Sequence, residues 1–285
     1  AVILIIAAGC RKPNDTSQQP QPPLPPPAPA PAVLLKDVIA HGLPSPLYHL
    51  EYNASGEATF LSYASDLRKY DIVYDNGRIV EMRNNITITL VSPNNDTIVT
   101  SINSDRLQYF YNNEGRVKTI NIADSTGSPY GRFHFTYDGQ KLIKFERERK
   151  SGLVFIIDRT MTMSYYADDN LMELSTHYPA TPFNGQQEFN HVVRFEQYDD
   201  KINVDGFDIL HPEFFDHVVL LPGIKLQKNN PRKQTKSGDG DDYTVDYTYT
   251  YSRDNAPMTK NGEFLYTSGV YTGRILHIST DFTYY

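Results

Sequence analysis

Residues 137–143 read Tyr-Asp-Gly-Gln-Lys-Leu-Ile, and this short phrase contains a turn between two strand-like stretches. Asp-Gly supplies the positive φ angles that a tight hairpin turn requires. Before the turn, Phe133, Phe135 and Tyr137 alternate with polar residues, which is the period-2 pattern of a strand with one buried face. After the turn, a basic residue opens a second apolar strand. The phrase therefore predicts a β-hairpin.

The same phrase recurs along the chain. Close copies read Tyr-Asp-Asn-Gly-Arg-Ile-Val at 74–80 and Tyr-Asn-Asn-Glu-Gly-Arg-Val at 111–117, and looser copies begin at Tyr166, Tyr198 and Tyr251. From the second of these to the copy at Tyr198, successive copies start about 25 to 32 residues apart, which suits two strands and their turns. We predict a mostly β fold, an antiparallel meander of successive hairpins that forms a large curved or barrel-like sheet.

The composition of the chain supports a β fold and argues against two classes of binding partner. The chain has 21 Tyr, 14 Phe and no Trp, and its expected strands carry Val, Ile and Thr. Residues 33–285 are enough for a single β-rich domain. The net charge of −7 argues against a nucleic-acid partner, which normally meets a basic patch. It also argues against electrostatic attraction to a membrane surface.

One stretch interrupts the hairpin pattern. Pro212 and Glu213 near its start and Pro222-Gly223 at its end predict one short helix over residues 211–221, which could cover an open end of the sheet. Residues 233–242 are expected to form an exposed loop before the last strands.

The beginning of the sequence indicates a lipid anchor. Nine apolar or small residues, Ala-Val-Ile-Leu-Ile-Ile-Ala-Ala-Gly, precede Cys10, the only cysteine in the chain. A spanning helix needs roughly 20 apolar residues, so cleavage is favoured over spanning. Small residues before a cysteine are typical of the end of a bacterial lipoprotein signal peptide. We expect residues 1–9 to be a signal peptide remnant and Cys10 to carry acyl chains such as palmitate.

Residues 10–32 then form a linker. Nine prolines among Gln, Ser and Ala leave few amide donors and favour extended polyproline II. The segment is expected to hold the β-rich domain away from the lipid. A proline-rich docking motif for a partner domain is the alternative.

Part of the sequence resembles a known group of proteins. Residues 228–233, Lys-Asn-Asn-Pro-Arg-Lys, with Tyr243–Tyr251 and the turn at 253–259, are similar to the C-terminal part of Bacteroidota envelope lipoproteins that carry a β-rich domain of unknown function. The turn departs from that pattern at Ala256, where glycine is expected. The Tyr-Asp-x-Gly-Arg phrases also resemble the YD repeats of Rhs-type shells, but are too few for a closed shell. The resemblance implies an envelope location and an antiparallel β fold, with no activity to carry over.

His211, Glu213 and His217 come closest to a metal or acid–base cluster. Histidines six apart do not share a helix face, unlike the i, i+4 pair of a zinc protease. We therefore favour a structural role, with both histidines on the surface of the predicted helix.

Asp239, Asp241 and Asp242 are weak candidates for calcium ligands on a glycine-rich loop. An EF-hand counted from Asp239 would need Glu at its twelfth position, where Thr250 stands. A solvated loop is favoured, and we expect no metal and no other cofactor.

Other catalytic patterns are weak. Glu146 and Glu148 share one face of a strand and could form the carboxylate pair of a glycoside hydrolase. Arg147 and Arg149 beside them instead suggest a charged solvent face. There is no Gly-x-Ser-x-Gly elbow. The tyrosines could stack on sugars but are better explained by cross-strand packing. No catalytic residue is predicted.

These observations favour a lipid-anchored protein of the bacterial outer membrane with a structural or binding role. It would meet the membrane through its lipid and an unidentified protein or glycan through its fold. An envelope glycan hydrolase and a carrier of an apolar ligand within the curved sheet are the alternatives. A filled aromatic core would support the first, a polar cleft with two converging carboxylates the second, and a dry cavity of several hundred Å³ the third.

Overall fold

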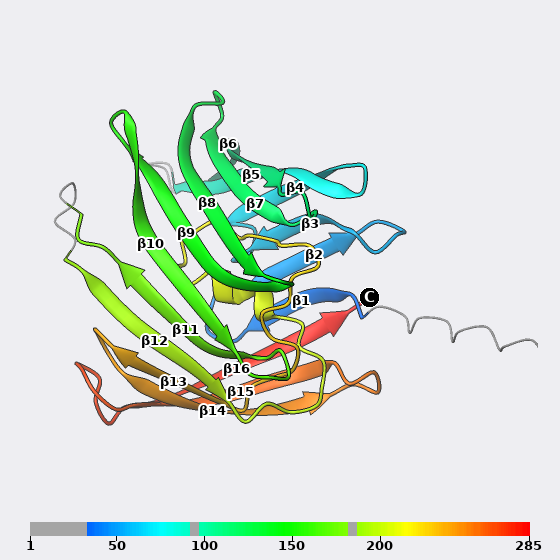
Figure 1. Ribbon diagram of the computed structural model, residues 1–285. Helices are drawn as coiled ribbons and strands as arrows, with labels where there is room; N and C mark the ends of the chain where they lie inside the picture. Colours follow the sequence, from blue (N-terminus) through cyan, green and yellow to red (C-terminus); the bar gives the residue numbers. More distant parts are fainter. Residues whose placement is uncertain (1–32, 92–96, 182–186) are drawn as a thin grey trace, which may run out of the picture. The chain divides into compact units, whose positions relative to one another are not determined.

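The computed structural model describes residues 33–91, 97–181 and 187–285. In these residues, sixteen antiparallel strands follow one another around a closed barrel (Figure 1). The strands are β1 (Leu35–Ala40), β2 (Tyr48–Tyr52), β3 (Ala58–Tyr63), β4 (Arg68–Asp75), β5 (Arg78–Val91), β6 (Thr97–Tyr111), β7 (Val117–Asp124), β8 (Pro129–Asp138), β9 (Lys141–Ser151), β10 (Val154–Tyr165), β11 (Leu171–Tyr178), β12 (Phe189–Glu196), β13 (Lys233–Gly238), β14 (Tyr243–Tyr251), β15 (Pro257–Tyr266) and β16 (Ile275–Tyr284).

The barrel closes between the first and last strands. Val38 lies opposite Phe282 and Ala40 opposite Thr280 in the β1–β16 pair. Every other pair joins strands that are consecutive in sequence. The predicted antiparallel meander with a barrel-like sheet is therefore confirmed, and it belongs to a compact unit that spans Val33–Tyr285.

Most of the repeated phrases form hairpin turns as predicted. Asn76 and Gly77, with φ of 49° and 71°, join β4 to β5, and Gly139, with φ of 54°, lies between β8 and β9. Asp169 and Asn255 take the same left-handed conformation in the looser copies. The copy at Tyr198 does not form a hairpin, because β12 ends at Glu196 and β13 begins only at Lys233.

Four tyrosines of these phrases and four other tyrosines share a role that packing alone does not describe. Near the end of each even-numbered strand, a hydroxyl donates to a backbone carbonyl at or near the start of the preceding odd-numbered strand. We call these eight hydrogen bonds the tyrosine latches. They run from Tyr52 to Leu35, Tyr74 to Ala58, Tyr111 to Ile79, Tyr137 to Val117, Tyr165 to Leu142, Tyr198 to Leu171, Tyr249 to Pro231 and Tyr284 to Pro257, over 2.5–3.0 Å. Each latch joins one hairpin to its neighbour at one rim of the barrel.

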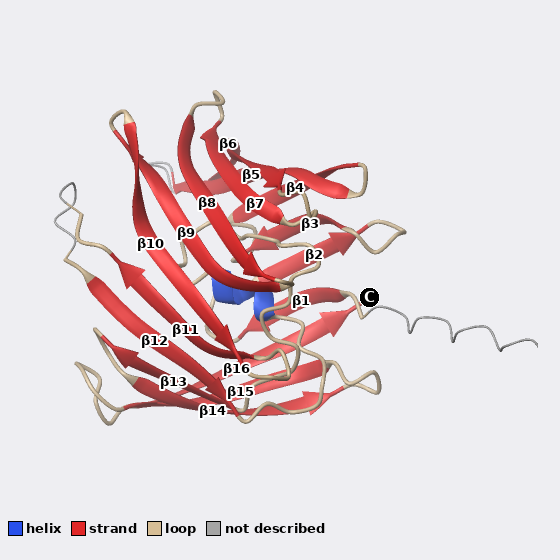
Figure 2. Ribbon diagram, in the orientation of Figure 1, coloured by secondary structure: helices blue, strands red, loops and turns tan. Residues whose placement is uncertain are grey.

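Residues 197–232, which we call the inner segment, run in large part inside the barrel. Figure 2 shows their loops and one short helix surrounded by strands. Their side chains contact strands on different sides of the wall, since His211 bonds to Tyr48 of β2 while Asp205 bonds to Lys260 of β15. Their apolar residues, Leu210, Val218, Val219 and Leu226, join the buried core. The barrel is therefore plugged by its own chain.

Two expectations for this region are wrong. The helix is a 3₁₀ helix, η1 (Gly206–Leu210), and residues 211–221 are not helical. His211, Asp216 and His217 each bind a different part of the wall, so the backbone between them follows these anchors rather than a helical path. Residues 233–238 form strand β13 instead of a loop, because they pair with both β12 and β14.

The two faces of the wall differ sharply in polarity. Inward positions carry the core, including Leu61, Met82, Leu107, Phe145 and Met161, all 0% exposed. Outward positions carry many charges, together with some exposed apolar side chains such as Phe110 and Leu276.

One outward row illustrates this difference. Pairing of adjacent strands aligns Glu51, Phe60, Asp71, Arg83 and Arg106, and its four charged members are exposed. In the described residues, no helix is long and apolar enough to cross a membrane.

A candidate binding cleft inside the barrel

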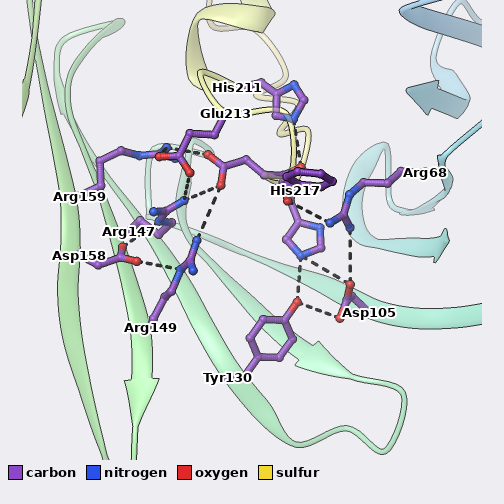
Figure 3. Close-up of polar contacts among 12 residues, drawn as sticks. Arg68, Asp105, Tyr130, Arg147, Arg149, Asp158, Arg159, His211, Glu213 and His217 are labelled. Atoms are coloured by element: carbon purple, nitrogen blue, oxygen red, sulfur yellow. Dashed lines mark hydrogen bonds and ion pairs between the residues drawn. The ribbon is translucent and has the colours of Figure 1, made fainter. Parts of the chain in front are cut away.

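Buried ion pairs hold the inner segment to strands β9 and β10 (Figure 3). Asp216 accepts hydrogen bonds from Nη1 of Arg147 at 2.5 Å and from Nη1 of Arg159 at 2.6 Å. Arg159 is 0% exposed, and Glu213 lies 3.2 Å from the same guanidinium. Such charge-assisted bonds are among the stronger contacts in proteins. They fix the middle of the inner segment.

A bulge in β10 places two charged residues on the inner face. The pairing of β9 and β10 shifts register between Ile157 and Arg159, so consecutive residues Asp158 and Arg159 are both buried. Asp158 accepts from Nε of Arg147 at 2.8 Å and lies 2.8 Å from Nε of Arg149. The cluster thus combines three guanidinium groups with three carboxylates.

A second polar cluster surrounds His217. Its Nε2 lies 3.0 Å from the hydroxyl of Tyr130, which also donates to Asp105 at 2.8 Å. Its Nδ1 lies 3.4 Å from the hydroxyl of Tyr70. Burial, with the nearby guanidinium of Arg68, lowers the pKa of His217 to about 4. The imidazole is therefore neutral near pH 7.

His211 is also buried and neutral near pH 7. Its Nδ1 lies 2.8 Å from the hydroxyl of Tyr48 and its Nε2 lies 3.0 Å from the carbonyl oxygen of Asp216. Burial lowers its pKa. The expectation of surface histidines is thus wrong, because both rings anchor the inner segment. Within the described residues, no three His, Cys, Asp or Glu side chains form a group that could hold a metal ion.

Two adjoining cavities lie between the inner segment and strands β9–β15, and we call them together the lumenal cleft. The first has a volume of about 700 Å³ and is lined by Arg147, Arg149 and Glu213 among others. The second has a volume of about 450 Å³. Both are lined by Tyr178 and His191, whose rings stack with centroids 6.2 Å apart.

The second cavity contains buried charges. Lys260 Nζ lies 3.0 Å from Oδ2 of Asp205 and 5.0 Å from the centre of the Tyr247 ring. Asp208 also lines this cavity. Burial, together with the negative charge of Asp205, raises the pKa of Asp208 to about 7.

A third cavity of about 440 Å³ is mainly apolar. Ile79, Phe207, Val219, Leu221 and Ile224 are among the residues that line it, between the inner segment and the wall.

Of the residues singled out from the sequence, Glu213 lines the cleft, whereas the glutamates of β9 and the loop aspartates do not. Glu146 and Glu148 are paired with neighbouring cations, with Glu146 3.1 Å from Lys144 and Glu148 3.1 Å from His134. Arg147, which was grouped with these outer charges, points inward instead.

The three loop aspartates bind backbone amides. Asp239 accepts from Asn190, Asp241 from Val270 and Asp242 from Gly238. Cys10 and the rest of residues 1–32 lie outside the described residues.

Comparison with known proteins shows the fold. A porin-like protein from Bacteroides uniformis ATCC 8492 superposes with a TM-score of 0.50 at 14% identity, covering 84% of this chain and 89% of that protein. A porin-like protein from Bacteroides vulgatus ATCC 8482 gives 0.50 at 14% identity, with 88% and 98% covered. This chain shares their barrel fold. No family model and no curated protein matches the sequence.

Proposed function

We propose that this chain is a lipid-anchored protein of the bacterial cell envelope whose barrel lies outside the bilayer and has a binding role. The polarity of the wall carries the proposal. A transmembrane barrel turns an apolar band about 25 Å tall toward lipid and keeps a polar interior. Here the apolar core lies inside, and charged residues such as Asp71, Arg83 and Arg106 face outward.

The plugged lumen favours binding over transport. A pore needs an open path, whereas the inner segment occupies this lumen and is held by Arg147 and Arg159. Moving it would break buried ion pairs, and breaking such a pair costs several kcal/mol. We therefore do not transfer a pore activity from the porin-like neighbours.

Membrane attachment then depends on Cys10. Each CH₂ group of an acyl chain that is buried in the bilayer contributes about 0.8 kcal/mol to membrane binding. Stable anchoring needs two or more membrane-binding groups, such as two acyl chains. A net charge of −7 adds no attraction to anionic lipid. The likeness to Bacteroides proteins and the resemblance to envelope lipoproteins both support the outer membrane as the location.

The lumenal cleft supports a binding role better than glycan hydrolysis. A glycosidase needs two carboxyl groups that face the substrate as acid and base or nucleophile. Asp158 is bound by Arg147 and Arg149, and Glu213 lies beside Arg159. These carboxylates serve the ion-pair cluster rather than an open reaction site.

Fatty-acid labelling tests the anchor. Cells that express the full chain are fed an alkyne analogue of palmitate, and the parent is compared with Cys10→Ala and with Ser17→Ala as the matched control. We expect label on the parent and the control only. Equal labelling of Cys10→Ala would refute the anchor.

The third cavity favours a second candidate function, the carriage of an apolar ligand. Its volume of about 440 Å³ and its lining of Ile79, Phe207 and Leu221 suit an aliphatic chain. A fluorescent fatty acid should then bind the parent, and Leu221→Trp, which fills the cavity, should bind less. Leu43→Trp, at an exposed site, is the control. Equal binding by all three proteins would exclude this cavity.

A further inference from the structure

One carboxylate in the second cavity has no partner. Asp208 belongs to η1 and lines the 450 Å³ space between the inner segment and the wall. Its side chain makes no hydrogen bond with a described residue and no ion pair within 4.0 Å. Asp208 is half-buried and forms part of the cavity wall.

The neighbouring charges are already engaged. Lys260 binds Asp205, which also accepts from Asn203 at 3.1 Å. Lys236 donates to the carbonyl oxygen of Asp241 at 2.9 Å and lies over the rings of Phe189 and Tyr243. Asp208 therefore adds a negative charge to the cavity that these cations do not neutralise by contact.

The rest of the cavity is lined by apolar side chains and suits the hydrocarbon part of a small molecule. Met161, Leu174, Val193 and Phe195 line it from strands β10, β11 and β12. The volume falls within the ~300–1,000 Å³ range of small-molecule sites, which are usually apolar with a few polar groups that fix orientation. Burial raises the pKa of Asp208 and so disfavours its charged form, and a ligand cation would offset this effect.

We propose that this cavity binds a small organic ammonium ion, with its nitrogen on Asp208 and its apolar body against Phe195 and Val193. The inference rests on the proposed binding role and adds the class of ligand. An anion is disfavoured because Lys260 is paired with Asp205 and Lys236 donates to the carbonyl oxygen of Asp241. A metal ion is disfavoured because the described residues supply no group of three His, Cys, Asp or Glu ligands. A neutral ligand would leave Asp208 unpaired.

The ligand can enter through the first cavity. Arg149 lines that cavity, and its side chain is 58% exposed, so the cavity opens to solvent at this residue. Tyr178 and His191 then separate the two cavities. Nδ1 of His191 is buried and has no hydrogen-bond partner among the described residues.

Binding should depend on pH through Asp208. Its pKa of about 7 means that the carboxyl group gains a proton as the pH falls below 7, and the cation then loses its partner. The other groups around it are Asp205, Lys260, Lys236, Tyr247 and His191. Burial lowers the pKa of His191 and raises that of Tyr247 to about 12, so neither changes charge between pH 7 and 8.5.

Calorimetry on the full chain tests the proposal, with cyclohexylammonium chloride as the probe and cyclohexanol as its neutral analogue. We expect the parent to bind the ammonium at pH 8.5, to bind cyclohexanol much more weakly, and to lose affinity at pH 6. Asp208→Asn should weaken binding by about 10-fold or more, since a hydrogen bond to a charged group is lost. Asp200→Asn, at an exposed site, is the matched control and should bind like the parent.

Each outcome decides the proposal. Equal binding by Asp208→Asn, or no binding of the ammonium by the parent, would overturn it. Thermal melting checks that Asp208→Asn is folded, and Leu174→Trp, which fills the cavity but keeps Asp208, should also lose binding. Failure here leaves the fatty-acid labelling of Cys10 unaffected, so the anchor and the ligand site can fail separately.

Discussion

Oδ2 of Asp216 lies 2.6 Å from Nη1 of Arg159, and this contact joins the inner segment to a strand that is 57 residues away in the sequence. Both side chains are buried, at 6% and 1% exposure. The pair therefore determines how firmly the lumen is plugged.

Removing one partner should destabilise the barrel. Arg159→Met leaves Asp216 with one guanidinium fewer in a buried site, and we expect a loss of about 3–5 kcal/mol in the free energy of unfolding. Urea titration followed by circular dichroism measures it. Arg194→Met breaks the exposed pair with Glu173 and should cost less than about 1 kcal/mol. Similar losses in the two variants would contradict a structural role for the buried cluster.

The tyrosine latches should contribute through their hydroxyl groups. Tyr74→Phe keeps the ring but leaves the carbonyl oxygen of Ala58 without its donor, at an expected cost of about 1–2 kcal/mol. Tyr271→Phe is the control, because the structure gives that exposed hydroxyl no hydrogen bond with a described residue. The comparison again uses urea unfolding, and an unchanged midpoint for Tyr74→Phe would show that the latch is dispensable.

Acid should weaken the hold on the inner segment. The pKa of His217 is about 4 in the folded state and 6.5 for a free histidine, so between these values the unfolded chain binds more protons. The contribution of His217 to the free energy of unfolding is therefore fully present above pH 6.5. It falls as the pH drops toward 4, by up to about 1.4 kcal/mol per pH unit. Asp105, Asp216, Arg68 and His211 surround the ring and affect the magnitude.

Asp208 acts in the opposite direction. Its pKa is raised from 3.8 to about 7, so between these pH values the folded state binds more protons than the unfolded state. The free energy of unfolding therefore decreases as the pH rises through this range. The two effects are separated by variants. His217→Gln should flatten the decline of stability between pH 6.5 and 4, and Asp208→Asn should raise the melting temperature most at pH 8. A His217→Gln profile parallel to that of the parent would rule out the histidine as the cause.

The sequence predicted the wall better than the lumen, for physical reasons. Turns such as Asn76-Gly77 are decided by local backbone preferences, so each hairpin can be predicted from a few residues. The inner segment is held by partners far away in sequence, with Tyr48 and His211 separated by 163 residues. Pro212 and Glu213 resemble a helix start, but these distant contacts override local propensity.

Part of the site was nevertheless visible in the sequence. Phe145 and Arg147 are two residues apart on β9, so their side chains lie on the same face of the strand. Because Phe145 is apolar and expected in the core, the sequence indicates that Arg147 also faces inward. Arg159 could not be placed in this way, because the bulge after Ile157 changes the parity of β10. Asp208 gives no signal in the sequence, since its lack of a partner depends on where Lys260 and Asp205 meet.

The proposed function requires that the outer wall of the barrel faces water rather than lipid, and spin labelling measures this. If Cys10 is acylated, a single new cysteine is the only free thiol, so Arg106→Cys and Glu263→Cys can each be labelled on opposite arcs of the barrel in membrane vesicles. Because Arg106 and Glu263 are exposed on the outer wall, we expect both labels to be relaxed by a water-soluble paramagnetic agent and not by oxygen dissolved in lipid. Labels that are protected from the water-soluble agent and accessible to oxygen in lipid would show instead that the wall lies in the bilayer.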